Sequence, residues 1–216
     1  MTDGPCHAPR RRRGWHPVLD RGAIMLLGMV LGLQVALASV TPIEAVTISP
    51  LFRQAFICGE HPEGELEWPG DALGTDCLVT GGIDPRSPVG FARTFRTDGM
   101  RNEDWYGWGA EVLAPFDGEV IRVVANDVVN PPGRFGKPPA AMLMFRRDDG
   151  VVVVYGHVAG VRVAVGERVS AGQVVALVGN NGMSRSPHIH VGALRGDTPL
   201  QIRWDLRAMG RLQRGE

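Results

Sequence analysis

From residue 111 onward, the chain consists of short runs rich in β-branched residues, separated by Gly and Asp turns. This texture is typical of an antiparallel sheet, because β-branched side chains pack well on a pleated surface and Gly or Asp suits tight turns. Asp148-Asp149-Gly150 is a good hairpin turn between two such runs. We therefore expect an all-β fold with an antiparallel sheet core, whose strands cover residues 111–114, 118–124, 141–146, 151–157, 162–165, 173–178 and 188–194.

The remaining segments lack the period of either a helix or a strand. Residues 126–139 contain two Pro-Pro pairs, so we expect an exposed loop there. Residues 39–99 carry scattered Gly, Pro and acidic residues, which predicts a loop-rich N-terminal extension. The last residues, 207–216, are expected to be a tail.

The N-terminus has the layout of a secretory signal. Basic residues 10–13 precede an apolar stretch at 23–40, which contains the small-residue pattern Ala36-Leu37-Ala38. Residues 1–38 are expected to be a signal peptide cleaved after Ala38, and the alternative is a signal anchor retained in the inner membrane. In both cases the protein is exported to the periplasm or cell envelope, and contact with a membrane is expected only if the segment is uncleaved.

Charge and cysteine content narrow the possible partners and compartment. The formal net charge is +0 and no basic stripe lies in the folded part, so no nucleic-acid partner is expected. Cys6 would leave with the signal, so Cys58 and Cys77 are the cysteines of the mature protein. In an oxidising compartment this pair predicts a disulfide, and two unpaired buried thiols are the alternative.

Three histidines are candidates for chemistry. His188 and His190 are two residues apart at the start of an expected strand, so both imidazoles project to one face of the sheet. His157 ends the apolar run that begins at Val151. Neutral imidazoles bind zinc or transfer protons near neutral pH, whereas satisfied surface histidines would explain the same pattern without function.

Several separated motifs resemble the M23 (LytM or lysostaphin-like) zinc peptidase domain, whose fold is related to the β-hammerhead. The resemblance covers residues 100–206. Its motifs follow in the order of that family: 109–120, Tyr155-Gly156-His157, then Gly166, Val169, Gly172 and Gln173, Val178-Gly179, and Ser186-Pro187-His188-Ile189-His190.

The resemblance implies a Zn²⁺ cofactor and a set of site residues. The family holds its metal with an H-x-x-x-D motif and the second histidine of H-x-H. Carried over, His190 and Asp104 become metal ligands, while His157 and His188 become the catalytic pair. The histidine of H-x-x-x-D then falls on Met100, whose soft thioether is a poor zinc ligand. Glu103, or His61 folding in from the N-terminal extension, is left open as the third ligand.

Neighbouring residues suggest a substrate-binding surface. Trp105, Tyr106 and Trp108 lie beside the expected acidic ligand, although clustered aromatics also serve as packing. Asn181 and Ser186 belong to the polar turn before the histidine pair, where turn chemistry explains them equally well.

The resemblance implies a zinc-dependent endopeptidase that hydrolyses peptide bonds in bacterial peptidoglycan. The missing ligand favours a second hypothesis, a catalytically degenerate relative that binds cell wall or regulates another cell-wall hydrolase. A third hypothesis is a biotinyl or lipoyl carrier, because Asp117-Gly118-Glu119-Val120 resembles part of that fold's repeats. Such a carrier needs a lysine at an exposed hairpin tip, whereas Lys137 lies in a proline-rich loop.

Overall fold

The computed structural model describes residues 41–82 and 92–215. The expected signal peptide, its cleavage site and Cys6 lie outside these residues. Within the described ranges, none of the helices has the length and apolar character needed to cross a bilayer.

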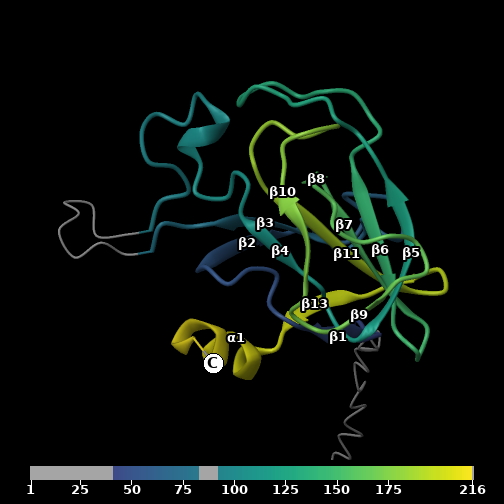
Figure 1. Cartoon of the computed structure of the whole chain (residues 1–216). Helices are drawn as coiled ribbons and strands as arrows, with labels where there is room; N and C mark the ends of the chain where they lie inside the picture. Colours follow the sequence, from purple (N-terminus) through teal and green to yellow (C-terminus); the bar gives the residue numbers. More distant parts are fainter. Residues whose placement is uncertain (1–40, 83–91, 216) are drawn as a thin grey trace, which may run out of the picture. The chain divides into compact units, whose positions relative to one another are not determined.

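The main sheet has eight strands and is antiparallel throughout. Figure 1 shows its strands side by side, with β7 and β11 in the interior of the sheet. The order along the sheet is β2 (Phe56–Glu60), β3 (Thr75–Val79), β11 (Ile189–Arg195), β7 (Val151–Gly156), β6 (Met142–Arg146), β5 (Gly118–Val124) and β9 (Arg168–Val169), with β12 (Thr198–Pro199) paired to β11.

Two smaller sheets and two helices complete the fold. A three-stranded antiparallel sheet has the order β4 (Glu111–Leu113), β10 (Val174–Val178) and β8 (Val158–Ala159). The strand β1 (Ala45–Ile48) pairs in parallel with β13 (Gln201–Trp204). The short 3-10 helix η1 (Asn102–Asp104) precedes β4, and α1 (Leu206–Arg214) ends the described chain.

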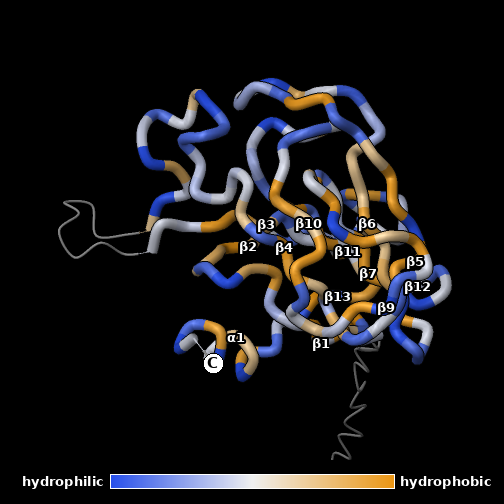
Figure 2. The backbone as a smooth tube through the Cα atoms, in the orientation of Figure 1, coloured by the Kyte–Doolittle hydropathy of each residue, from blue (hydrophilic) through white to orange (hydrophobic). Residues whose placement is uncertain are grey.

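The hydrophobic core includes residues of both larger sheets. The strands β7 and β11 are buried along most of their length, as expected for interior strands covered on both faces, and Figure 2 shows hydrophobic colouring on them. The buried hydroxyl of Tyr155 donates a hydrogen bond to the Leu113 carbonyl (3.1 Å), which ties β7 to β4. This rigid centre positions the start of β11, where the histidine pair lies.

The all-β antiparallel fold is confirmed, and two local predictions are wrong. No strand forms at 162–165; the Arg162 N–H bonds the Val175 carbonyl (2.8 Å), and 168–169 pairs with β5 instead. The tail is partly helical, because Asp205 caps α1 by accepting from the Arg207 and Ala208 N–H groups. This helix was not predicted, because it has nine residues and contains Gly210, a weak helix former.

The N-terminal extension is more ordered than predicted. It supplies β1, β2 and β3, and the last two extend the main sheet beside β11. These strands are only four or five residues long, so each gives a weak local sequence signal. Pairing within the sheets that contain β11 and β13 stabilises them.

The predicted disulfide between Cys58 and Cys77 is confirmed. The two residues lie opposite each other across β2 and β3, with their Cα atoms 4.1 Å apart. The bond therefore joins the two strands directly.

Candidate metal centre

The register of three neighbouring strands places ionisable groups on one face of the main sheet. Asp76 on β3 lies opposite His190 on β11 and, on its other side, opposite Gly59 on β2. His61 follows two residues after Gly59, and its N–H continues the ladder by bonding the Gly74 carbonyl (2.8 Å). Directly paired residues, and residues two apart on a strand, project to the same face. The sheet geometry therefore brings His61, Asp76 and His190 together.

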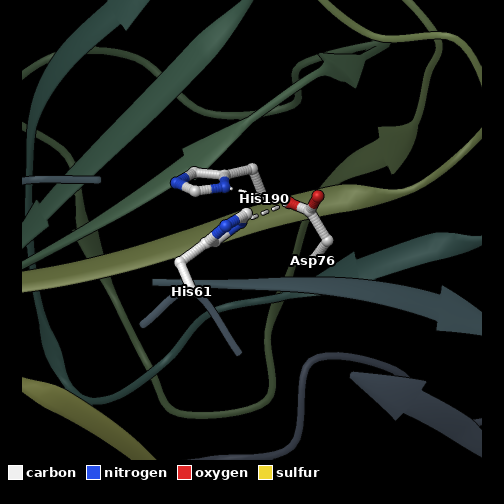
Figure 3. Close-up of side chains that lie close together, drawn as sticks. All are labelled: His61, Asp76 and His190. Atoms are coloured by element: carbon white, nitrogen blue, oxygen red, sulfur yellow. Dashed lines mark hydrogen bonds and ion pairs between the residues drawn. The ribbon is translucent and has the colours of Figure 1, made fainter. Parts of the chain in front are cut away.

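These side chains converge on one carboxylate oxygen. Asp76 Oδ1 lies 2.9 Å from His190 Nδ1 and 3.5 Å from His61 Nε2. Figure 3 shows both imidazoles reaching this oxygen, His190 from β11 and His61 from the segment that follows β2. One candidate ligand atom from each of the three residues lies within 4.8 Å of the others.

The donor set fits zinc. Two imidazole nitrogens and one carboxylate oxygen are the ligands of many catalytic zinc sites, which leave the fourth position open. His61 Nε2 is buried and, within the described part of the chain, makes no hydrogen bond, although it lies near Asp76. A buried polar atom without a partner is costly, and a metal ion between these groups would satisfy it. The three residues can therefore hold such an ion.

The charges at this cluster are strongly coupled. Burial raises the pKa of Asp76, but hydrogen bonds and charges from His188 and His190 hold it well below its usual range. Burial lowers the pKa of His190, but the carboxylates of Asp71 and Asp76 outweigh burial and raise it to about 9. Without a metal, the site is thus occupied by an imidazolium paired with carboxylate, and a divalent cation would replace that positive charge.

His157 and His188 stand beside this group. His188 is two residues before His190, and its Nε2 lies 3.5 Å from Asp76 Oδ1. His157 follows Gly156, the residue opposite His190 on β7, and its backbone has a positive φ of 63°. Such a conformation is strained for a non-glycine residue and occurs often at functional sites. The two rings are 4.7 Å apart between centroids.

Backbone carbonyls define the tautomers of both rings. His157 Nδ1 lies 2.8 Å from the Asn181 carbonyl oxygen, and His188 Nδ1 lies 2.8 Å from that of Ser186. A carbonyl oxygen only accepts, so each Nδ1 carries the hydrogen and donates. Each Nε2 is therefore left with a lone pair that can accept a proton.

His157 is held neutral. Burial, together with the nearby charge of His188, lowers its pKa to about 4. Its ring therefore remains uncharged at neutral pH, whereas an unfolded chain would begin to protonate it near pH 6.5.

This difference makes folding stability pH-dependent. The unfolded state binds more protons between pH 6.5 and pH 4, so stability falls as the pH drops through this window. At pH 5 the loss from His157 is expected to be about 2 kcal/mol relative to pH 7.5. Denaturant unfolding of the metal-free protein at both pH values would measure it. The His157→Gln variant should lack this component; an equal pH dependence in both proteins would contradict the assignment.

The structure places the predicted acidic ligand elsewhere. Asp104 lies in η1, where its carboxylate accepts from the Arg101 N–H (3.1 Å), and it is not a member of the group around His190. Met100 is 68% exposed. In their place the group contains Asp76 and His61, of which His61 was one of the alternatives left open. Four residues before Asp76, where H-x-x-x-D has its histidine, the chain has Ala72.

The residues predicted to bind substrate have mixed surroundings. Trp105 donates from Nε1 to the Gly99 carbonyl (2.9 Å), and the Arg96 guanidinium stacks over Tyr106. The side-chain amide of Asn181 bonds the Ala141 N–H and the Val158 carbonyl, so it is already used within the protein. Ser186 orients His188 through its carbonyl. Contact of these residues or of Trp108 with substrate stays a prediction.

Comparison with known families settles the nature of the C-terminal region. Residues 105–202 match the model of peptidase family M23. This region is similar to the peptidases of family M23. The match contains His157, His188 and His190, whereas His61 and Asp76 lie before its first residue. The M23-like region and the N-terminal segment β2–β3 thus each supply part of the candidate metal-binding group.

Curated relatives match a short part of the chain. The chain is 34% identical over 92 residues to the DD-carboxypeptidase/endopeptidase Mpg of Neisseria meningitidis and Neisseria gonorrhoeae. That alignment covers 43% of this chain and 21% of Mpg, so the chain spans about a fifth of the length of these relatives.

Two solved structures have a similar fold. A point mutant of the catalytic domain of the prophage-encoded M23 protein EnpA from Enterococcus faecalis is 20% identical, with a TM-score of 0.43 over 68% of this chain and 87% of its own. The catalytic domain of lysostaphin from Staphylococcus simulans is 18% identical, with a TM-score of 0.40 over 65% of this chain and 80% of its own.

Proposed function

We propose that this protein is a zinc-dependent endopeptidase that hydrolyses peptide bonds in bacterial peptidoglycan. The observation that carries the proposal is the convergence of His61, Asp76 and His190 beside the neutral imidazole of His157 and the Nε2 of His188. The M23 match and the endopeptidase name of its Neisseria relatives support the reaction class.

In this proposal, His61, Asp76 and His190 hold the metal. Bound zinc supplies Lewis-acid polarisation of the scissile carbonyl and makes water a better nucleophile near neutral pH. Two imidazoles and one carboxylate leave a position open for substrate, because a catalytic zinc with three protein ligands has a free fourth site.

We assign proton transfer and hydrogen bonding to the other two histidines, His188 and His157. His188 is not one of the three proposed ligands, and its Nε2 lies 3.5 Å from Asp76 Oδ1, so it is placed to take the proton from an attacking water and return it to the leaving amine. His157 stays neutral and offers its Nε2 as a hydrogen-bond acceptor beside the ring of His188. The carbonyls of Asn181 and Ser186 hold both rings in the required tautomer.

Metal removal tests the function. Purified sacculi incubated with the full chain should release peptides with new amino termini, detected by mass spectrometry. Chelation with EDTA should abolish the release, and zinc added in slight excess should restore it. Release that continues after complete metal removal, or that never occurs with the zinc-loaded protein, would overturn the proposal.

Substitution of His188 and His157 should separate catalysis from metal binding. His188→Gln is expected to lower the rate of peptide release by about 100-fold, since loss of a general base typically costs this much. Zinc stoichiometry should stay near that of the wild type, because His188 is not in the metal-binding group. His157→Gln should have a smaller effect on rate. Loss of zinc from His188→Gln, measured by metal analysis, would contradict these roles.

A second candidate function is a catalytically degenerate relative that binds peptidoglycan or regulates another hydrolase. Ala72 at the histidine position of H-x-x-x-D favours it. Binding of the zinc-loaded chain to sacculi without any peptide release would support this function over hydrolysis.

The proposed substrate requires the protein to be exported. The N-terminal sequence predicts export, and the Cys58–Cys77 disulfide is consistent with an oxidising compartment outside the cytoplasm. Fractionation of cells that express the full chain would test this location.

A further inference from the structure

We propose that Asp71 is a positioning residue for the metal site, which fixes the tautomer and orientation of His190. This inference rests on the proposed function, because it concerns how His190 presents a nitrogen to the metal. Neither the M23 match at 105–202 nor the H-x-x-x-D motif includes Asp71.

Both nitrogens of the His190 ring face a carboxylate. Nδ1 lies 2.9 Å from Asp76 Oδ1, and Nε2 lies 3.0 Å from Asp71 Oδ1. The Nε2 atom is buried and makes no hydrogen bond among the described residues, and Asp71 Oδ1 is its close polar neighbour.

The turn that carries Asp71 is built against β11. The Asp71 and Ala72 N–H groups both bond the Trp68 carbonyl, and the Asp71 carbonyl accepts from the Gly74 N–H. A Cβ atom added to Gly192 would collide with the Gly70 carbonyl oxygen, and one added to Gly74 would lie 2.7 Å from the Asp71 carbonyl oxygen. Only glycine at these positions lets the turn approach β11 so closely.

The same close approach reaches His190 itself. The added Cβ at Gly74 would also lie 3.0 Å from His190 Cε1, so the turn borders the ring directly. Leu73 next to it has a positive φ of 57°, a strained conformation that the surrounding contacts maintain. The position of Asp71 is thus determined by packing rather than by a free loop.

The chemistry of zinc-bound histidine explains what this carboxylate does. A neutral imidazole binds metal through one nitrogen while the other carries a hydrogen, and a carboxylate that accepts this hydrogen selects the tautomer and strengthens the ligand. With Nε2–H directed at Asp71, the lone pair of Nδ1 points toward Asp76 and His61. The opposite tautomer would turn the lone pair away from those ligands.

Substitution of Asp71 tests the inference in the full-length protein. Asp71→Ala is expected to weaken zinc affinity by about 10- to 100-fold, the usual effect of removing such a partner, measured by competition with a chromogenic chelator. Asp71→Asn should lose less, because its amide oxygen still accepts a hydrogen bond but carries no charge. Asp197→Asn, at an exposed turn, is the matched control and should bind zinc like the wild type.

A spectroscopic measurement separates positioning from general damage to the fold. Two-bond ¹H–¹⁵N correlation spectra of the zinc-loaded wild type should show His190 as the pure Nε2–H tautomer, and Asp71→Ala should show loss of that single state. Wild-type affinity together with an unchanged His190 spectrum in Asp71→Ala would overturn the inference while leaving the zinc peptidase intact. A wild-type protein that binds no zinc would overturn both.

Discussion

Replacement of His61 by alanine is expected to lower zinc affinity by roughly 1000-fold and to abolish peptide release. Structural zinc sites gain about 10–16 kcal/mol from their ligands, so one ligand is worth about 4 kcal/mol, or three factors of ten in affinity. The loss is expected because two protein ligands, Asp76 and His190, would remain of the group of three. Affinity would be measured by chelator competition and activity by mass spectrometry of digested sacculi.

Matched variants make this prediction specific. Glu65→Gln removes the carboxylate 3.3 Å from His61 Nδ1 but keeps the ligand, so zinc affinity should fall by less than about 10-fold. Asp76→Ala should resemble His61→Ala, whereas Asp104→Ala should bind zinc like the wild type. Zinc affinity that survives His61→Ala and is lost in Asp104→Ala would show that the metal is held by a different set of residues.

Loss of the Cys58–Cys77 disulfide is expected to destabilise the protein by about 3 kcal/mol. The bond closes a loop with a sequence separation of 19, and in the chain-entropy model such a cross-link removes this much free energy from the unfolded state. For a domain of this size the melting temperature should fall by about 6–12 °C. Denaturant and thermal unfolding of the Cys58→Ser/Cys77→Ala variant would measure both quantities.

The disulfide also bears on the metal site. It joins the two strands next to the pair Gly59 and Asp76, so it holds the register that places His61 beside Asp76. Reduction of the wild type should therefore reproduce most of the loss of stability and also weaken zinc binding. Addition of the same reductant to the double variant is the control and should change neither. Unchanged stability after verified reduction would contradict this role.

Much of the M23 region was predictable from sequence. The runs at 118–124, 151–157 and 188–194 have β-branched residues and turn signals that act locally, so their strands form close to the predicted bounds. The short strands β1 to β3 were not predicted, because their stability comes from pairing with β11 and β13 rather than from local preference.

The three histidines at 157, 188 and 190 were identifiable for a similar reason: strand alternation and the family's motifs are properties of contiguous sequence. The acidic member of the candidate group around His190 was not identifiable. The H-x-x-x-D motif was aligned with Met100 and Asp104, which predicted Asp104 as the acidic ligand. The strand Thr75–Val79 also contains a carboxylate, that of Asp76. The residues next to an aspartate in the sequence do not show whether its carboxylate lies near His190.

The sequence by itself determined the all-β class, the disulfide and the histidine pair, because each depends on residue type and short-range spacing. Only the tertiary structure decided that Asp76 and His61 join His190. Their proximity depends on the pairing of β2, β3 and β11. Asp76 on β3 and His190 on β11 lie 114 positions apart in the sequence. Register between distant strands is set by packing of the whole sheet, and no local pattern in the chain encodes it.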